Sequence, residues 1–186
     1  TVARMERDGL LVVETDRTVK LTPTGAKLAR DVMRKHRLAE CLLTEVIGLD
    51  WDKVHDEACR WEHVISVDVE KRLVEILDSP TFSPYGNPIP GLKELGVQTD
   101  HHPFRQGAEP LADVVATDVR PFMLRRMSEN IQADAEILSE LAAAGLRPGV
   151  RFEAARNAEG VQVTIGERVL DLTPFAAELL FVEAIA

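Results

Sequence analysis

The chain has 186 residues, 45% of them hydrophobic, which is enough to bury a core and to form one domain with a smaller second one. No apolar run approaches the ~18 residues of a membrane-spanning helix, and the N-terminus lacks the basic-then-apolar pattern of a signal peptide, so we predict a soluble protein. The two cysteines exclude a disulfide framework and favour a reducing cytoplasm.

Charge is distributed unevenly along the chain. The formal net charge is −9, but residues 1–38 hold nine Lys/Arg and five Asp/Glu, a net of +4, which leaves −13 for the other 148 residues. A basic end on an acidic body is typical of a protein that contacts phosphate with that end alone.

The basic segment has the pattern of a helix, a hairpin and a second helix. Residues 11–15 and 18–21 predict two strands joined by a tight turn. Thr22 or Thr24 can then cap a helix that begins near Gly25. This order is that of the back half of a winged-helix DNA-binding domain.

Three arginines in this segment are candidates for contacts to DNA phosphates, namely Arg4, Arg7 and Arg17. Arg17 would lie at the tip of the hairpin. The alternative is a purely structural hairpin in which Arg17 is only a turn residue.

Residues 54–64 combine metal-binding residue types at helical spacing. His55, Cys59, Glu62 and His63 fall within roughly 100° of arc on one helical face. A thiolate, an imidazole and a carboxylate within about one turn can bind one divalent transition metal ion. The alternative is a solvated face with one cysteine turned into the core.

A second metal site is predicted because His55 lies roughly 12 Å of helix rise from His63, too far to share an ion with it. An earlier segment offers His36 and Glu40, again four residues apart and on one helical face. The sequence therefore predicts two metal sites along one helix.

The rest of the chain divides into a helical part, a linker and a strand-rich part. Residues 67–77 predict an amphipathic helix, and residues 91–96 a short one. Residues 98–110 lack periodicity and predict a linker. The apolar stripe of the first helix consists of Val69, Leu73, Ile76 and Leu77. The predicted strands are 113–119, 123–128, 151–155, 161–165 and 169–172, with a helix over 133–144 that ends at Gly145, a pattern that suits a small β-barrel.

Several motifs resemble the iron-dependent regulators of the diphtheria toxin repressor family. The likeness runs almost continuously over residues 1–97 and is weaker beyond them. The motifs are MERDGL (5–10), LTPTG (21–25), MRKHRLAE (33–40), ACRWEHV (58–64) and GNPIPG (86–91).

The resemblance implies a mostly α fold with some β structure, in four segments. These are a partial winged helix-turn-helix domain (1–30), a helical metal-binding and dimerisation domain (31–97), a linker (98–110) and a C-terminal SH3-like β-barrel (111–186). It implies a cytoplasmic, homodimeric, iron(II)-activated repressor that binds double-stranded operator DNA and controls iron homeostasis, with no catalytic residues.

The resemblance also implies the site residues. Cys59, Glu62 and His63 would form an activating site, and His36, Glu40 and His55 an ancillary site. Glu129 and Gln132 would complete the ancillary site, although oxygen donors three residues apart could equally be ordinary surface residues. An anion would bind at Arg37, Ser83 and Asn87.

The chain departs from the family pattern at its start. Family members begin with further residues that carry the first helices and most of the recognition helix. The resemblance therefore implies that this chain opens inside that helix and lacks a methionine ligand of the activating site.

Two other functions are compatible with parts of the pattern. A Cys/Glu/His site with an open position resembles a metalloenzyme, but no further acid or base is apparent beside Cys59. A metal buffer or carrier leaves the hairpin and the β-barrel unexplained. We expect a repressor that uses Fe²⁺ and that accepts Co²⁺, Ni²⁺, Zn²⁺ or Mn²⁺ in its place, because the usual affinity order does not single out iron.

Overall fold

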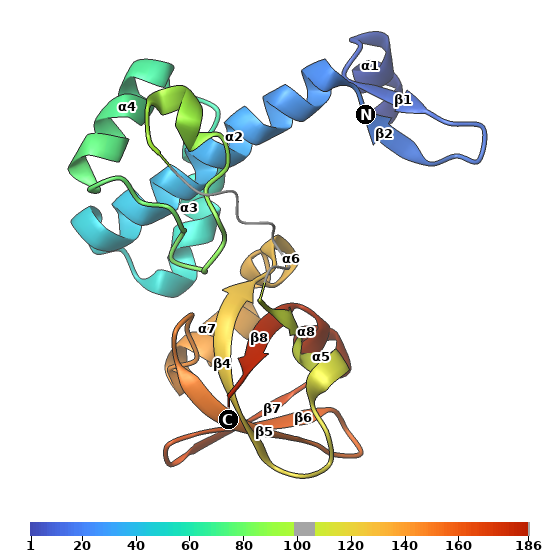
Figure 1. Ribbon diagram of the computed structural model, residues 1–186, viewed down its shortest axis with the longest axis vertical. Helices are drawn as coiled ribbons and strands as arrows, with labels where there is room; N and C mark the ends of the chain where they lie inside the picture. Colours follow the sequence, from blue (N-terminus) through green and yellow to red (C-terminus); the bar gives the residue numbers. More distant parts are fainter. Residues whose placement is uncertain (99–106, 186) are drawn as a thin grey trace.

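The computed structural model describes residues 1–98 and 107–185 (Figure 1). The N-terminal part consists of α1 (Val2–Arg7) and an antiparallel hairpin of β1 (Leu11–Val13) and β2 (Val19–Leu21). The predicted hairpin is confirmed, with shorter strands than expected. Arg17 has φ of 68° in the turn, and Asp16 Oδ1 accepts hydrogen bonds from the backbone N–H and the hydroxyl of Thr18, which fixes the turn locally.

Helix α2 (Pro23–Leu42) joins the hairpin to the rest of the molecule. Its 20 residues span about 30 Å. Thr22 is its N-cap and accepts a hydrogen bond from the Gly25 N–H, while Pro23 occupies the first position, where a missing N–H costs nothing. Figure 1 shows the hairpin standing away from the other elements on the first turns of this helix.

The second half of α2 belongs to a helical cluster. A π-helical turn (η1, Leu43–Ile47) and a 3₁₀ turn (η2, Trp51–Lys53) lead to α3 (Val54–Trp61), α4 (Val67–Ile76) and a last 3₁₀ turn (η3, Leu92–Leu95). Leu38 and Cys41 of α2 pack in one core with Ala58 of α3 and with Leu73 and Val74 of α4.

One expectation for these helices needs correction. The predicted helix through Val64 ends at Trp61, so Glu62 and His63 leave the regular helical face. The amphipathic helix predicted over 67–77 is found as α4, with Leu73 and Leu77 of its apolar stripe buried and Val69 and Ile76 46% and 61% exposed.

The C-terminal part is built on a six-stranded antiparallel sheet with the order β3-β8-β4-β5-β6-β7. The strands are β3 (Glu109–Pro110), β4 (Arg120–Met127), β5 (Arg151–Arg156), β6 (Val161–Ile165), β7 (Arg168–Leu172) and β8 (Leu180–Ala184). The helices are α5 (Leu111–Val114), α6 (Glu129–Gln132), α7 (Ala135–Ala144) and α8 (Pro174–Glu178).

The expected strand over 113–119 is wrong. Leu111 and Val115 are buried four residues apart, which is the spacing of one helical turn, and α5 forms there before β4 begins at Arg120. The helix predicted over 133–144 is found as α7, which is capped by Asp134 and ends at Gly145 in the left-handed region. The predicted linker falls mostly on residues 99–106, which lie outside the described residues.

The loop before η3 docks the sheet onto the helices. The Tyr85 carbonyl accepts from the Met127 N–H at 3.0 Å, and Asn87 Nδ2 donates to the Met127 carbonyl at 2.9 Å. Gly86 has φ of 78°, and a Cβ there would lie 1.9 Å from the Arg125 carbonyl oxygen. Only glycine permits this approach, which brings the end of β4, and α6 behind it, against the helical cluster.

A buried ion pair ties α2 to α4. Arg34, 3% exposed, donates from Nε to Glu70 Oε1 at 2.8 Å, and Glu70 has no exposed surface. The same guanidinium contacts Asp31 at 3.0 Å and Glu94 of η3 at 3.3 Å.

No helix within the described residues is long and apolar enough to cross a membrane.

We expect Arg34→Met to lower the free energy of unfolding by about 3–5 kcal/mol, because it leaves the buried Glu70 carboxylate without its cation. Urea unfolding followed by circular dichroism measures the change. Arg72→Met is the matched control, since Arg72 pairs with Glu75 on the exposed surface of α4 and should change stability by no more than about 0.5 kcal/mol. Equal effects of the two substitutions would contradict the role assigned to Arg34.

Candidate metal centre

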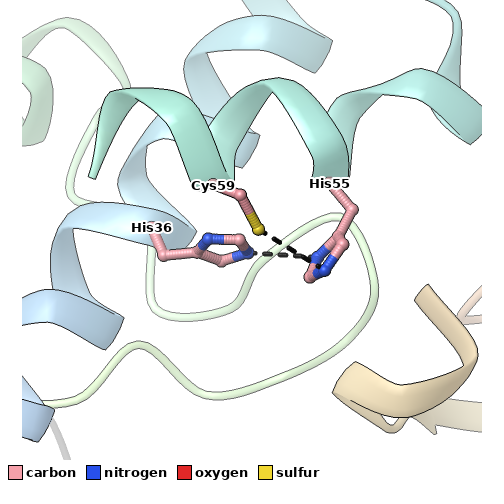
Figure 2. Close-up of side chains that lie close together, drawn as sticks. All are labelled: His36, His55 and Cys59. Atoms are coloured by element: carbon pink, nitrogen blue, oxygen red, sulfur yellow. Dashed lines mark hydrogen bonds between the residues drawn. The ribbon is translucent and has the colours of Figure 1, made fainter. Parts of the chain in front are cut away.

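Helices α2 and α3 cross so that one face of each contributes metal-binding side chains. His36 and Glu40 come from α2, and His55 and Cys59 from α3, each pair four residues apart. Figure 2 shows His36, His55 and Cys59 pointing toward one another between the two helices. The i, i+4 spacing seen in the sequence therefore places the donors as expected.

The centre of the site is a buried carboxylate between two imidazoles. Glu40 Oε1 lies 2.8 Å from His36 Nε2 and 3.4 Å from His55 Nδ1, and these two ring nitrogens are 3.2 Å apart. Glu40 has no exposed surface and His36 is 2% exposed. Desolvation opposes ionisation of Glu40, but the hydrogen bonds from His36 and His55 outweigh it and lower the pKa of the carboxyl group.

His36 faces carboxylates with both ring nitrogens. Nδ1 lies 2.8 Å from Glu62 Oε2, while Nε2 faces Glu40. Desolvation opposes protonation of this ring, but the hydrogen bond and the charge of Glu40, with the charge of Glu129 and the bond to Glu62, raise its pKa.

Helix α6 of the C-terminal part adds oxygen donors to the cluster. One donor atom from each of His36, Glu40, His55 and Glu129 lies within 4.8 Å of the other three. Glu129 Oε1 accepts from Arg37 at 2.5 Å, and its Oε2 is buried without a hydrogen-bond partner among the described residues. The structure thus brings together four of the five residues predicted for the ancillary site.

Gln132, the fifth, lies three residues after Glu129 in the same short helix and is 2% exposed. Its Nε2 donates to the Met127 carbonyl at 2.8 Å, and its Oε1 is buried without a hydrogen-bond partner in the part of the chain that is described. The amide oxygen is therefore available as a donor to a cation.

The donor atoms of the three residues predicted for the activating site do not converge on one point. Cys59 Sγ lies 3.7 Å from His55 Nε2, and Glu62 is engaged by His36. The His63 side chain is 70% exposed and is 3.4 Å from Glu62 Oε1. The physical reason is that α3 ends at Trp61, so the single helical face assumed over residues 54–64 stops before Glu62.

The Cys59 thiol is not deprotonated in advance of metal binding. Partial burial, together with the negative charges of Glu62 and Asp56, raises its pKa to about 11. At neutral pH the thiol keeps its proton, and a metal ion must displace that proton to bind the sulfur.

The predicted anion-binding residues cluster around the docking loop. Arg37 donates to the Pro88 carbonyl and to Glu129, both at 2.5 Å, which leaves its Nε buried and without a partner among the described residues. Ser83 Oγ accepts from the Tyr85 N–H at 3.2 Å, and Asn87 uses its amide N–H on Met127. Ser83 and Asn87 therefore stabilise the loop by hydrogen bonds, and Arg37 binds the Glu129 carboxylate of α6.

Sequence reasoning overlooked Tyr85, the only tyrosine of the chain. It is fully buried, its ring lies edge-on to His55 with centroids 6.5 Å apart, and its hydroxyl donates to the Trp51 carbonyl at 2.7 Å. It supports the His55 ring from behind. The signal in the sequence was the single tyrosine of the chain, which lies inside a Pro/Gly/Asn-rich segment.

The arginines predicted to contact DNA lie far along the chain from this cluster and are exposed. Arg4 and Arg7 contact Asp8 at 3.7 and 3.4 Å, and Arg17 lies in the hairpin turn. Exposed ion pairs of this kind contribute little, so the guanidinium groups can exchange to other anions.

The donor set fits a divalent transition metal ion. It combines two imidazoles, a thiol and buried carboxylates, and three of its buried oxygens have no hydrogen-bond partner among the described residues: Glu40 Oε2, Glu129 Oε2 and Gln132 Oε1. Buried acceptors without donors are costly, and a cation satisfies several at once.

Comparison with known proteins gives one consistent family. A family model described as iron dependent repressor, metal binding and dimerisation domain matches residues 22–91. A diphtheria toxin repressor of Corynebacterium efficiens is 46% identical over 185 residues, which cover all of this chain and 80% of that protein. An iron-dependent repressor IdeR of Mycobacterium tuberculosis is 52% identical over 165 residues, 89% of this chain and 71% of the relative.

Solved structures agree with these relatives. A manganese-dependent transcriptional repressor in complex with manganese has a TM-score of 0.77 at 30% identity and covers 99% of this chain and 81% of its own. The IdeR of T. acidophilum, at 24% identity and a TM-score of 0.74, shares the fold. The two relatives are named as repressors and the manganese-dependent protein as a transcriptional repressor, a class of regulators and not of enzymes.

We expect Glu40→Gln to reduce the stabilisation that a metal ion gives this chain. An ion at 100 times its dissociation constant raises the free energy of unfolding by about 2.7 kcal/mol, and loss of the central negative charge weakens binding and shrinks this gain. Urea unfolding with and without Co²⁺ measures it, and the difference within each variant cancels effects on the fold itself. Glu45→Gln, an exposed acid on η1, is the control. An equal cobalt effect in both variants would rule out Glu40 as part of the site.

Proposed function

Because the chain belongs to the diphtheria toxin repressor family of iron-dependent regulators, we propose that it is an iron(II)-activated, DNA-binding transcriptional repressor that controls iron homeostasis. The observation that carries the proposal is the buried donor group of His36, Glu40, His55 and Glu129. His36, Glu40 and His55 lie in the segment that matches the family's metal-binding and dimerisation domain, and Glu129 lies outside it.

We assign the ion-binding residues to two sites. His36, Glu40, His55, Glu129 and Gln132 form the ancillary site, and Cys59, Glu62 and His63 form the activating site. Arg37, Ser83 and Asn87 hold an anion beside the first. The activating site requires Glu62 and His63 to turn toward Cys59, and the exposed side chain of His63 has the freedom to do so.

A bound divalent ion would supply positive charge and tie the helices that carry its donors. The residues of this chain do the rest. Arg37 holds Glu129 against α2, and the Asn87 and Tyr85 contacts to Met127 keep α6 in place. Because α2 also carries the hairpin at its other end, an adjustment at the cluster moves the hairpin with it.

The DNA-binding part is the partial winged helix-turn-helix domain of residues 1–30. Arg4, Arg7 and Arg17 contact phosphates of a double-stranded operator, and these contacts position the protein without reading sequence. The −13 charge of the remaining chain repels the duplex, so contact is restricted to this end. We place the repressor in the cytoplasm.

Two copies form a homodimer through the helical domain. We propose that the exposed apolar side chains of η1, of α4 and of the turn before α4 form one apolar patch, namely Val46, Ile47, Val64, Val67 and Ile76. Burial of such a patch favours association, and a two-fold axis presents two hairpins to two half-sites. We assign the C-terminal sheet to the SH3-like fold.

The defining experiment is chromatin immunoprecipitation of the protein from cells grown with iron and with an iron chelator. We expect discrete promoter peaks next to iron-uptake genes that are present with iron and lost with the chelator. Peaks that do not respond to iron, or no peaks in either condition, would refute the proposal. A metalloenzyme or a metal carrier, the alternatives considered from the sequence, predicts no promoter peaks.

Dimerisation gives a prediction at one residue. Val64 is 80% exposed, and we expect Val64→Asp to turn the dimer into a monomer at micromolar concentration because it places a charge in the apolar patch. Sedimentation equilibrium measures the mass. Val119→Asp is the control, since Val119 is 64% exposed in the C-terminal part, away from the patch. A wild-type chain that is monomeric at that concentration would contradict the assignment.

Salt dependence tests the DNA-contacting arginines. Each neutralised phosphate contributes about 0.9 to the slope of log K against log salt, so Arg17→Ala should reduce the slope by about one unit per subunit contact. Fluorescence anisotropy with a labelled duplex between low and moderate salt measures it. Arg120→Ala, an exposed arginine of the sheet, should leave the slope unchanged. Identical slopes for wild type and Arg17→Ala would remove Arg17 from the interface.

A further inference from the structure

Arg147 of the C-terminal part lies over an aromatic ring of the helical cluster. It follows α7, and its Cζ is 5.0 Å from the centroid of the Trp51 ring. A guanidinium at this distance from the face of an indole is attracted by the quadrupole of the ring. Trp51 is 5% exposed and opens η2, the 3₁₀ turn that runs directly into α3. The C-terminal part therefore contacts the helices here as well as at the end of β4 and at α6.

The turn that carries Arg147 is anchored to the sheet. Leu146, the residue before it, has no exposed surface. The Val150 N–H donates to the Arg147 carbonyl at 3.0 Å, and the Gly149 N–H donates to the Leu124 carbonyl of β4 at 2.7 Å. The position of the guanidinium therefore follows the position of the sheet. A movement of the C-terminal part away from the helices would withdraw it from the indole.

Trp51 leads through Tyr85 to a residue of the metal centre. The centroids of the Trp51 and Tyr85 rings are 4.8 Å apart, and the Tyr85 hydroxyl donates to the Trp51 carbonyl at 2.7 Å. The Tyr85 ring in turn lies edge-on to His55, with centroids 6.5 Å apart. The Trp51 carbonyl also accepts from the Val54 N–H, where α3 begins. Trp51 therefore borders His55 both through an aromatic ring and through the backbone that starts its helix.

We propose that Arg147 is a positioning residue for His55, and that it makes metal binding depend on the docking of the C-terminal part. With the guanidinium on Trp51, the indole, the Tyr85 ring and the start of α3 stay in place. The His55 ring then keeps its Nδ1 toward Glu40. Without the guanidinium these groups have more freedom, and the His55 ring must be ordered at the moment an ion binds, which weakens binding.

The proposal adds regulation to the metal-binding part of the proposed function, on which it rests. Glu129 and Gln132 are assigned as ligands from the C-terminal part, whereas Arg147 touches no ligand and acts through two aromatic rings. Coupling between two sites is reciprocal, so an ion bound at His55 should also strengthen the docking of the turn that carries Arg147. Metal binding and domain docking are in this way linked by a route that does not pass through α6.

Nuclear magnetic resonance of chains with ¹⁵N-labelled histidine tests the coupling without metal. We expect Arg147→Met to shift the ring signals of His55, which a His55→Gln spectrum assigns. Arg151→Met is the matched control, because it removes another exposed arginine of the C-terminal part, on β5, and should leave these signals in place. Identical His55 signals in the wild type and in Arg147→Met would overturn the proposal.

Titration with Co²⁺ measures the effect on affinity. We expect Arg147→Met to weaken the class of site that His36→Ala removes by about two- to fivefold, the change in an equilibrium constant that corresponds to an exposed cation–π contact. Arg147→Lys keeps a cation over the ring and should recover most of the affinity, and Arg151→Met should not change it. Circular dichroism establishes that each variant is folded. Equal affinities of the wild type and Arg147→Met would refute the positioning role.

Two double variants separate the positioning of His55 from simple docking of Glu129. If Arg147 acted only by keeping Glu129 near the ion, Arg147→Met would have no effect in a chain that already carries Glu129→Gln. We expect its effect to persist there and to vanish in a chain with Trp51→Leu, where the guanidinium has no ring to contact. An effect that disappears with Glu129→Gln, or one that survives Trp51→Leu, would contradict the proposal.

The failure of this proposal is distinguishable from the failure of the proposed function. If Arg147→Met binds Co²⁺ as the wild type does, the positioning role falls and the proposed repressor is unaffected. If the wild type binds Co²⁺ but shows no iron-dependent DNA binding, the proposed function fails and the role of Arg147 stands. If the wild type binds no Co²⁺, both the proposed metal site and its regulation by Arg147 are wrong.

Discussion

The rest of the structure depends on one buried carboxylate. Glu40 has no exposed surface, and an ionised acid in such a place must be neutralised where it lies. His36 and His55 hydrogen-bond to one of its oxygens, Oε1, and the other, Oε2, has no partner among the described residues. Desolvation alone would raise the pKa of Glu40 and lower that of His36, but their mutual hydrogen bond and charges outweigh it, so the pKa of the acid is lowered and that of His36 is raised.

Helix α2 connects this electrostatic centre to the other surfaces. Its second half carries His36 and Glu40, and from the same part of the helix Arg34 contacts α4 and Arg37 contacts α6. Its first half is mostly exposed and carries the hairpin. A continuous helix of this length is stiff. A movement of its second half at the metal cluster therefore also moves the hairpin at its other end.

Features that depend on residues close together in the chain could be predicted from the sequence, whereas the arrangement of distant segments could not. The Thr22 cap, the turn before Thr18 and the i, i+4 donor pairs depend on neighbouring residues, so patterns of a few residues predicted them. Strand β8 was not predicted, and residues 113–119 were assigned to a strand although their first two residues belong to α5. Periodicity over so few residues does not separate a buried turn of helix from a strand.

The candidate site shows the same division. Four ancillary residues meet as the pattern and the resemblance implied. The positions of Glu62 and His63 did not follow, because helical spacing assumes that the helix continues, and α3 ends one residue earlier than Glu62. Tyr85 lies in a loop without periodicity, where no spacing rule applies.

The contact between Arg37 and Glu129 spans 92 residues of chain. During synthesis at about 5–20 residues per second, the α2 donors leave the ribosome roughly 5–20 s before the carboxylate that completes their cluster. A nascent chain therefore passes through an interval in which His36, Glu40 and His55 have been synthesised and Glu129 has not. Binding by the full donor set becomes possible only after this interval, so the order of translation sets the earliest moment at which the site can be complete.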